Sequence, residues 1–170
     1  MTRIVVTSAS GANGDGYGAL LCFSADGQLA GPFSEDRRIT DPRGLSLSPA
    51  ADLVYVTSGD DRVLALDQNG TVVLDSGRAQ GLLDPGGGTF APDGRYCVTL
   101  RRRGTILALP PGLDTEGEPL LPDGSVPFPR ASASVSAASC ACPRVSVPPV
   151  RATTRSPCST TTAGCSPRGR

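Results

Sequence analysis

The residues that could perform chemistry in this chain are few, and the first group lies near the amino terminus. Residues 11–16 read Gly-Ala-Asn-Gly-Asp-Gly, a mixture of amide, carboxylate and glycine that suits a calcium-binding loop. The first and twelfth positions of such a loop need acidic ligands, whereas Gly11 and Cys22 stand there. The sequence therefore favours a flexible connection between strands, although connections of this kind commonly carry binding residues.

A second group is the basic run Arg101-Arg102-Arg103-Gly104. Guanidinium groups bind carboxylate and phosphate through paired hydrogen bonds, so this run could hold an anion. A short run of like charges is also typical of a solvated turn between strands, and we favour that interpretation. The adjacent carboxylates of Asp60 and Asp61 would face opposite sides of a strand, which makes them poor partners for acid–base catalysis.

Cysteine and glycine clusters offer two further possibilities, and the spacing of both argues against a site. Four cysteines near the carboxyl terminus could hold zinc, but none of them forms the usual C-x-x-C pair; they are Cys140, Cys142, Cys158 and Cys165. Gly86-Gly87-Gly88 lacks the Lys-Ser/Thr that follows in a phosphate-binding loop. We therefore predict no catalytic, cofactor-binding or metal-binding residues from these motifs.

Composition narrows the classes of function. The 170 residues suffice for one domain with a single core, and 16 basic residues balance 16 acidic ones. No overall charge therefore favours nucleic acid or an anionic membrane as partner. Histidine is absent, which removes the commonest general base and metal ligand. Lysine is absent too, and we attribute this to codon usage in a GC-rich bacterial gene.

Hydropathy gives an expectation for location. No apolar run approaches the roughly 20 residues that a membrane-spanning helix needs. The apolar stretch within residues 1–7 is also too short for a signal peptide. We therefore expect a soluble, cytoplasmic protein, in which Cys22 and Cys97 lie in apolar runs and are buried as small hydrophobic residues.

The elements that must position any site are indicated by an internal repeat with an offset of 43 residues. The matching segments are 42–49 with 85–92, 62–66 with 105–109, and 20–23 with 63–66. Each repeat consists of short apolar runs separated by turn residues. A period of this length and composition is typical of the blades of a β-propeller.

The clearest repeat spans residues 39–74 and predicts four antiparallel strands. We expect them at 45–48, 53–57, 62–67 and 71–74. Leu45 and Leu47 alternate with serines, which is the pattern of a strand with one buried face. Asn69-Gly70 is a strong hairpin signal, because both residues accept a positive φ.

This repeat resembles the NHL repeat and the blades of gluconolactonase-like (SMP-30-like) and streptogramin-lyase-like propellers. The resemblance rests on Pro42-x-Gly44-Leu45, on Asp52-Leu53-Val54-Tyr55-Val56, and on Arg62-Val63 with Leu66-Asp67-x-x-Gly70. Two departures stand out: Gly59-Asp60-Asp61 replaces the asparagine that commonly precedes the arginine, and Thr105 replaces the arginine in the next copy. The resemblance covers about residues 4–130.

The resemblance implies an all-β fold, a partial β-propeller of about three four-stranded antiparallel blades over residues 1–130. It also implies a scaffold that binds an unknown protein or small molecule, without catalysis in the chain as translated. The alternative is the remnant of a metal-dependent lactonase or lyase acting on a cyclic ester. Relatives of that kind hold a divalent metal such as calcium on the ring axis, and Glu35 does not match their first acidic ligand.

Residues 131–170 differ in character from the repeats, because they contain no Asp or Glu and are rich in Ser, Pro, Arg and Cys. One interpretation is a disordered tail. The other is a shift of reading frame after Arg130, because inferred codons re-read in the next frame give Gly-Phe after Pro129-Arg130. The same frame gives Asp-Asp-Thr-Ile-Ala-Val-Phe-Asp-His-Asp-Gly-Arg-Leu across residues 153–165, which matches residues 61–72.

An open stack of about three blades has a physical consequence for partners. Repeats bury their apolar faces on their neighbours, so a stack that does not close exposes such faces at both ends. We therefore expect poor solubility, or self-association of partial rings that closes the propeller.

Overall fold

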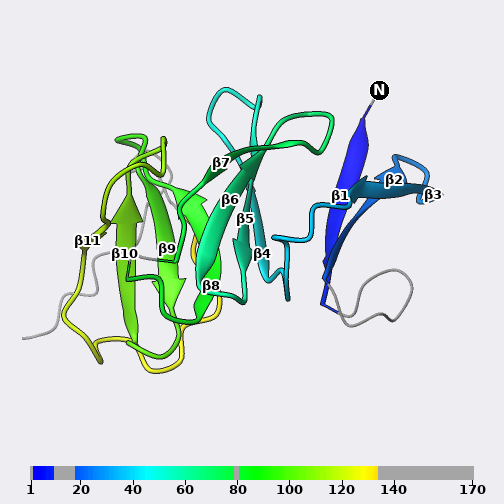
Figure 1. Cartoon of the computed structure of the whole chain (residues 1–170). Coiled ribbons are helices and arrows are strands. Elements are labelled where there is room, and N and C mark those ends of the chain that lie inside the picture. Colours follow the sequence, from blue (N-terminus) through cyan, green and yellow to red (C-terminus); the bar gives the residue numbers. More distant parts are fainter. Residues whose placement is uncertain (1, 10–17, 79–80, 134–170) are drawn as a thin grey trace, which may run out of the picture. The chain divides into compact units, whose positions relative to one another are not determined.

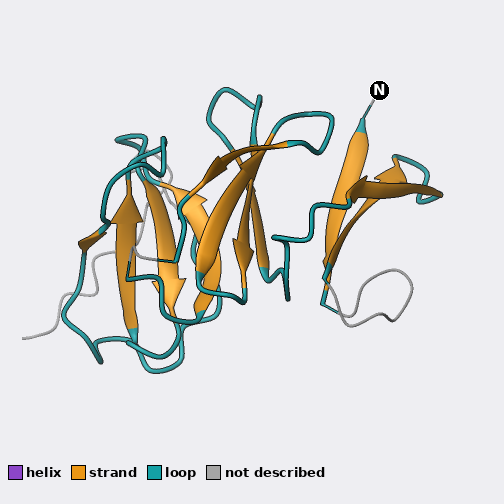
Figure 2. Cartoon of the chain, viewed as in Figure 1, coloured by secondary structure: helices purple, strands orange, loops and turns teal. Residues whose placement is uncertain are grey.

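The structure, a computed structural model, describes residues 2–9, 18–78 and 81–133. The chain divides into two units, Met1–Ser139 and Cys140–Arg170, and every described residue belongs to the first unit. The loop at 11–16 and the tail with its four cysteines, Cys140, Cys142, Cys158 and Cys165, lie outside the described residues. Every secondary-structure element in the described ranges is a β-strand, and neighbouring strands pair in antiparallel fashion (Figure 2).

The strands form three sheets whose members follow one another in sequence order (Figure 1). The first sheet has three strands: β1 (Arg3–Ser8), β2 (Ala19–Ser24) and β3 (Leu29–Ser34). The second has four: β4 (Gly44–Leu47), β5 (Val54–Ser58), β6 (Arg62–Leu66) and β7 (Val72–Asp75). The third has β8 (Pro85–Phe90), β9 (Tyr96–Leu100), β10 (Thr105–Leu109) and β11 (Glu118–Pro119). The predicted all-β partial propeller and the four predicted strands of residues 39–74 are confirmed.

The strand registers show which strands are equivalent in the three blades. Thr57 pairs with Val63 in the second blade, and Thr99 pairs with Ile106 in the third. In the first blade Thr7 pairs with Leu20, which lies 43 residues before Val63. β1 is therefore the second strand of its blade, equivalent to β5 and β9. No described residue supplies the innermost strand of the first blade, the position that β4 and β8 fill in the others.

The second blade is buried on both faces. On β6, Val63 and Ala65 belong to one cluster of buried side chains, whereas Leu64 and Leu66 belong to another. Successive side chains of a strand point to opposite faces, so both faces of this sheet are covered. This explains why the strand has a continuous apolar sequence in place of an alternating one.

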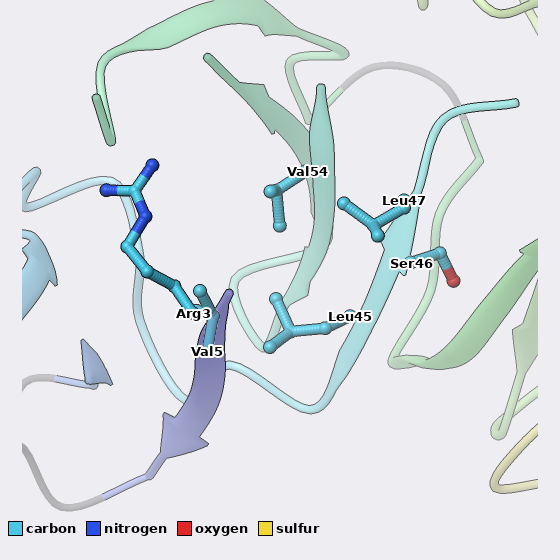
Figure 3. Close-up of a pocket in the computed structure, with 6 residues that line it drawn as sticks. All are labelled: Arg3, Val5, Leu45, Ser46, Leu47 and Val54. Carbon is cyan, nitrogen blue, oxygen red and sulfur yellow. The ribbon is translucent and has the colours of Figure 1, made fainter. Parts of the chain in front are cut away.

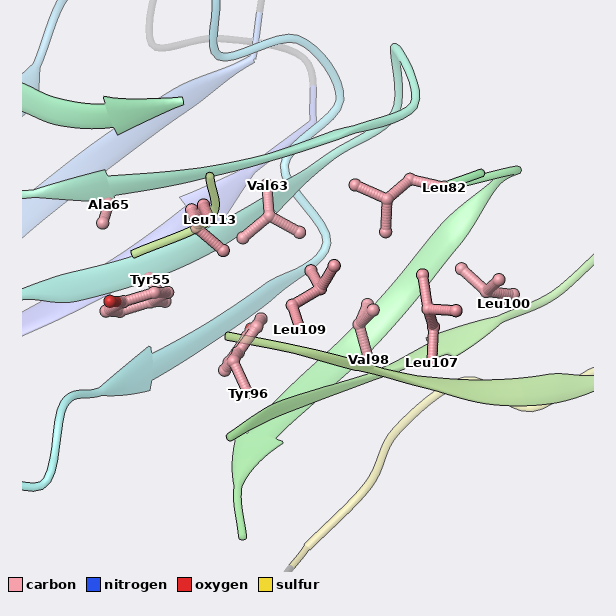
Figure 4. Close-up of a cluster of buried hydrophobic side chains, with 10 residues drawn as sticks. All are labelled: Tyr55, Val63, Ala65, Leu82, Tyr96, Val98, Leu100, Leu107, Leu109 and Leu113. Atoms are coloured by element: carbon pink, nitrogen blue, oxygen red, sulfur yellow. The ribbon is translucent and has the colours of Figure 1, made fainter. Parts of the chain in front are cut away.

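Each cluster joins two neighbouring blades. The first lies between the second and third blades and is shown in Figure 4: Tyr55, Val63, Ala65, Leu82, Tyr96, Val98, Leu100, Leu107, Leu109 and Leu113. The other joins the first and second blades: Leu20, Cys22, Phe33, Ile39, Val56, Leu64 and Leu66. Cys22 and Cys97 are free and buried, as predicted.

The innermost strand β4 corrects one expectation. Leu45 and Leu47 were expected to share a buried face, but Leu47 is 62% exposed and Leu45 is only partly buried. The reason is that β4 packs closely against β8 on one side, whereas no inner strand among the described residues covers its other side.

The predicted hairpin at Asn69-Gly70 is confirmed, and it has a second role. The amide of Gly70 donates to the carbonyl of Asp67 (3.0 Å), and Gly70 has φ +82°. A Cβ on Gly70 would lie 1.7 Å from the carbonyl oxygen of Phe33, the last residue but one of β3. Glycine is therefore required here both by the turn and by the close contact between the first two blades.

Candidate functional site

The loops that lead into the inner strands share an unusual backbone conformation. Three residues that each precede a proline have positive φ: Asp41 (44°), Asp84 (54°) and Phe128 (48°). A positive φ costs a residue other than glycine about 1–3 kcal/mol and persists only where the surroundings impose it. The chain therefore builds the same turn three times, although Phe128 lies beyond the last strand of the third blade.

Close backbone contacts confirm that the third turn is equivalent to the other two. A Cβ on Gly44 would lie 2.8 Å from Cα of Gly87, and a Cβ on Gly87 would lie 2.9 Å from Cα of Ala131. The amide of Gly87 also donates to the carbonyl of Arg130 (2.6 Å). Ala131 therefore approaches the inner strand of the third blade in the same way as Gly87 approaches the inner strand of the second. Residues 129–131 therefore lie at the position where the inner strand of a further blade would begin.

A pocket of about 340 Å³ lies beside the segments that enter the inner strands. Its lining comes from segments far apart in the sequence: Ala9, Asp41, Pro42, Arg43, Gly86, Arg101 and Arg130. Ala9 follows β1, Arg101 begins the turn between β9 and β10, and the others belong to the entries of successive inner strands. Repetition of the blade therefore brings three arginines to one cavity.

Arg43 is held between two blades by two carboxylates. Its guanidinium lies 2.7 Å from Asp41 (Nη2 to Oδ2), and it also pairs with Asp84 and donates to the carbonyl of Pro85 (3.2 Å). Burial acts to raise the pKa of Asp84, but the hydrogen bond from Arg43 and the charges of Arg43, Arg101 and Arg102 outweigh it, so the pKa is lowered. Asp84 is therefore ionised at neutral pH and is no general acid.

Arg130 differs from Arg43 although the two are equivalent by position. The residue two places before Arg43 is Asp41, whereas the residue two places before Arg130 is Phe128. Arg130 is exposed and forms no ion pair with any described residue. Among the charged lining groups and Asp84, three guanidinium groups face two carboxylates, which leaves one net positive charge.

This arrangement suits binding of a small anion better than bond-breaking chemistry. Guanidinium groups present several N–H donors in a fixed planar fork that matches carboxylate and phosphate. The two carboxylates at the pocket are both paired with arginine, and histidine is absent from the sequence. Among the described residues no group of three or more His, Cys, Asp or Glu is arranged to hold a metal ion.

The basic run at 101–103 lies in the predicted turn, and the structure divides it. Arg101 lines the pocket, 3.7 Å from the carboxylate of Asp84. Arg102 is exposed, and Arg103 pairs with Asp123 at 3.1 Å outside the pocket lining. One of the three arginines therefore belongs to a site, whereas the other two behave as members of a turn.

The other candidate residues lie apart from this pocket. Asp60 pairs with Arg62 (2.8 Å), whereas Asp61 accepts a hydrogen bond from the amide of Asp84 (2.8 Å), so the two carboxylates have separate partners. Glu35 is exposed in the loop after β3. Gly86-Gly87-Gly88 forms part of β8, where Gly86 and Gly87 allow residues 130–131 to approach.

Arg43 and Arg130 were not predicted as site residues. The signal that could have found them is the dipeptide Pro-Arg at the same place in the repeat, at 42–43 and 129–130, although the same dipeptide also occurs at 143–144 and 167–168. It is recognisable as part of the repeat, but convergence of the two side chains on one pocket depends on the spatial packing of the blades. Gly86 lines the pocket together with these two arginines, and nothing in the sequence predicts that it is buried there.

Comparison with known proteins gives matches by structure and none by sequence. No known protein family matches the chain, and no curated protein sequence matches it. Among solved structures, a streptogramin B lyase superimposes over 63% of this chain with TM-score 0.51 and 18% identity. The nidogen–laminin complex matches over 71% (TM-score 0.57, 15% identity), and a luciferin-regenerating enzyme over 68% (TM-score 0.51, 19% identity).

These likenesses establish the fold, a segment of a β-propeller. The chain spans only 35% to 43% of the length of the three structures. The likeness extends both to enzymes and to a protein complex, so the fold is compatible with catalysis or with binding. The described residues include no helix long and apolar enough to cross a membrane.

Proposed function

We propose that this chain is a ligand-binding β-propeller segment without catalytic activity, and that its site is the arginine-lined pocket at the entries of the inner strands. The ligand class is a small carboxylate or phosphate. One observation carries the proposal: Arg43, Arg101 and Arg130 come from three separate loops and line the same cavity.

Arg130 has no ion-pair partner among the described residues, and this supports the assignment. Arg43 has two carboxylate partners and serves to join neighbouring blades, whereas Arg130 has none among the described residues. Arg101 is half-buried beside Asp84 and contributes a second guanidinium to the same wall. An anion placed between Arg101 and Arg130 would supply the negative charge that Asp41 supplies to Arg43.

The test is calorimetric titration of the whole chain with inorganic phosphate and with malonate at low ionic strength. Arg130→Gln should weaken binding by about tenfold or more, because a charge-assisted hydrogen bond is lost. Arg95→Gln is the matched control, since Arg95 follows the far end of β8 and pairs with Asp93. Equal losses in both variants, or no binding by the unmodified chain, would contradict the proposal.

A second variant tests the charge argument without removing an arginine. Phe128→Asp places a carboxylate two residues before Arg130, as Asp41 stands before Arg43. Phe128 is 79% exposed, so the substitution should not disturb the core. We expect Phe128→Asp to weaken anion binding, whereas Phe128→Asn leaves it unchanged. Unaltered binding by both variants would show that Arg130 does not hold the anion.

The alternative is the remnant of a metal-dependent lactonase or lyase, and likeness to a streptogramin B lyase and a luciferin-regenerating enzyme supports it. The residues at the pocket do not fit a divalent cation. Arg43 pairs with both Asp41 and Asp84, and Asp61 accepts a backbone amide. Binding of calcium or manganese in the micromolar range, lost in Asp84→Asn, would favour the alternative.

A further inference from the structure

The two ends of the described stack are complementary. At one end the first blade has β1, β2 and β3 but no inner strand among the described residues. At the other end residues 129–131 lie against β8 where an inner strand of a further blade would begin, and no strand pairs with them among the described residues. Among the described residues, one end therefore has a sheet edge without a partner strand, and the other has a segment placed for an inner strand without a sheet to join.

A pocket lies at the unpaired edge. It has a volume of about 190 Å³ and is lined by side chains of β1, β4 and β5 (Figure 3): Arg3, Val5, Leu45, Ser46, Leu47 and Val54. Figure 3 shows Leu45 and Val54 facing Val5 across the opening. On its opposite side β4 packs against the inner strand β8, as shown by the hydrogen bond that the hydroxyl of Ser46 donates to the carbonyl of Gly88 (2.5 Å).

This pocket lies where the first blade would have its inner strand, which no described residue supplies. In the second blade β4 pairs with β5, so that Gly44 faces Thr57 and Leu45 faces Val56. β1 is equivalent to β5, so an added strand would pair with the open edge of β1 in the same way as β4 pairs with β5. That added strand would then lie next to β4, just as β4 lies next to β8. It would cover Leu47, which is 62% exposed.

We propose that a second copy of this chain supplies that strand, and that two copies close one six-bladed ring. Residues 131–133 of each copy pair with β1 of the other, so both junctions contain a composite blade. Each chain contributes three blades, and six lies within the usual 4–8 blades of a closed propeller. The chain spans 35% to 43% of the propeller structures it resembles, so two copies approach the length of one.

The register is given by the equivalent pairs of the second blade. Ala131 is equivalent to Gly44, and Thr7 is equivalent to Thr57, so Ala131 of one copy faces Thr7 of the other. Ser132 then faces Val6, and Ala133 faces Val5. Val6 is 41% exposed in the single chain and becomes part of a paired strand. Closure by a two-fold axis uses the same junction twice and leaves no open sheet edge at either end.

The first test is the mass of the whole chain in solution, measured by size-exclusion chromatography with light scattering. We expect twice the chain mass of 17.3 kDa. Ala133→Pro should shift the protein toward monomer, because proline removes an amide from the added strand. Ala133→Ser is the control and should remain dimeric. A monomer at about 100 µM, or assemblies that grow with concentration, would overturn the closed dimer.

The second test fixes the register by cross-linking. Facing residues in antiparallel strands have Cα atoms about 4.5–5.5 Å apart, which suits a disulfide. The double variant Val6→Cys with Ser132→Cys should form a covalent dimer on oxidation, seen at twice the chain mass without reductant. Val6→Cys alone and Ser132→Cys alone control for the six native cysteines. A dimer whose double variant cross-links no better than either single variant would overturn the proposed strand exchange.

Discussion

At Asp84 two opposing influences act on one carboxyl group. Burial favours the neutral form, whereas the hydrogen bond from Arg43 and three nearby guanidinium charges favour the carboxylate and prevail. The folded pKa therefore lies below the ordinary value of 3.8. A lowered pKa means that the ionised carboxylate stabilises the folded state above that value, and that this contribution is lost as the pH falls below it.

This predicts an acid-sensitive junction between the second and third blades. In urea unfolding between pH 6 and pH 3, the unmodified chain should lose stability as the pH falls. Asp84→Asn should be less stable at pH 6 and should show a smaller loss on acidification. Asp93→Asn, on an exposed hairpin, is the comparison, and its stability at pH 6 should change less. Parallel pH profiles for the unmodified chain and Asp84→Asn would contradict this account.

Tyr55 combines apolar packing with one polar contact. Its ring lies 4.8 Å from Phe90 and 5.0 Å from Tyr96, centroid to centroid, and its hydroxyl donates to the carbonyl of Pro111 at 2.5 Å. Tyr55→Phe keeps the ring and should cost about 1 kcal/mol of unfolding free energy. Tyr55→Ala leaves a cavity between two blades and should cost about 3–5 kcal/mol. Chemical denaturation measures both, and similar costs would show that the hydroxyl, not the ring, dominates.

At the scale of elements, the turn glycines separate two physical effects. Gly27 and Gly70 have the same φ of +82° in equivalent hairpins. An added Cβ at Gly27 would meet nothing within 4 Å, whereas at Gly70 it would meet the carbonyl of Phe33. Gly27→Ala should therefore cost only the backbone term, about 1–2 kcal/mol. Gly70→Ala should cost clearly more, because β3 must move, and equal costs in thermal unfolding would contradict this contact.

The sequence predicts the elements of the second and third blades well, because the offset of 43 residues is regular there. The first blade is harder, since Val6-Thr7-Ser8 and Val56-Thr57-Ser58 are equivalent but lie 50 residues apart. A longer connection between β1 and β2 breaks the period. The pocket could not be predicted, because its residues come from loops of separate blades and their convergence depends on packing. The exposure of Leu47 likewise depends on whether another strand lies beside β4, and the sequence of β4 alone does not decide it.

At the scale of the whole molecule, the blade repeat extends past the last strand of the third blade. The turn at Phe128 reproduces those at Asp41 and Asp84, and residues 129–131 lie where an inner strand begins. The repeat therefore continues structurally through the point where its sequence pattern stops. We propose that the gene holds further blades in another reading frame, with residues 131–170 translated out of frame.

Sequencing the gene across the codons for residues 127–132 and downstream tests this proposal. The re-read frame should place glycine after Pro129-Arg130, where Gly44 and Gly87 stand in the other repeats and an added Cβ would lie within 3 Å of the next inner segment. An apolar residue should come next, as Leu45 does, and strands should recur at the same offset without early stop codons. The third frame is the control and should show no such period. In the restored protein the ring would close within one chain, so we expect it to be monomeric, whereas we expect the present chain to be dimeric. Early stop codons in the re-read frame would leave the two-chain ring as the way this stack closes.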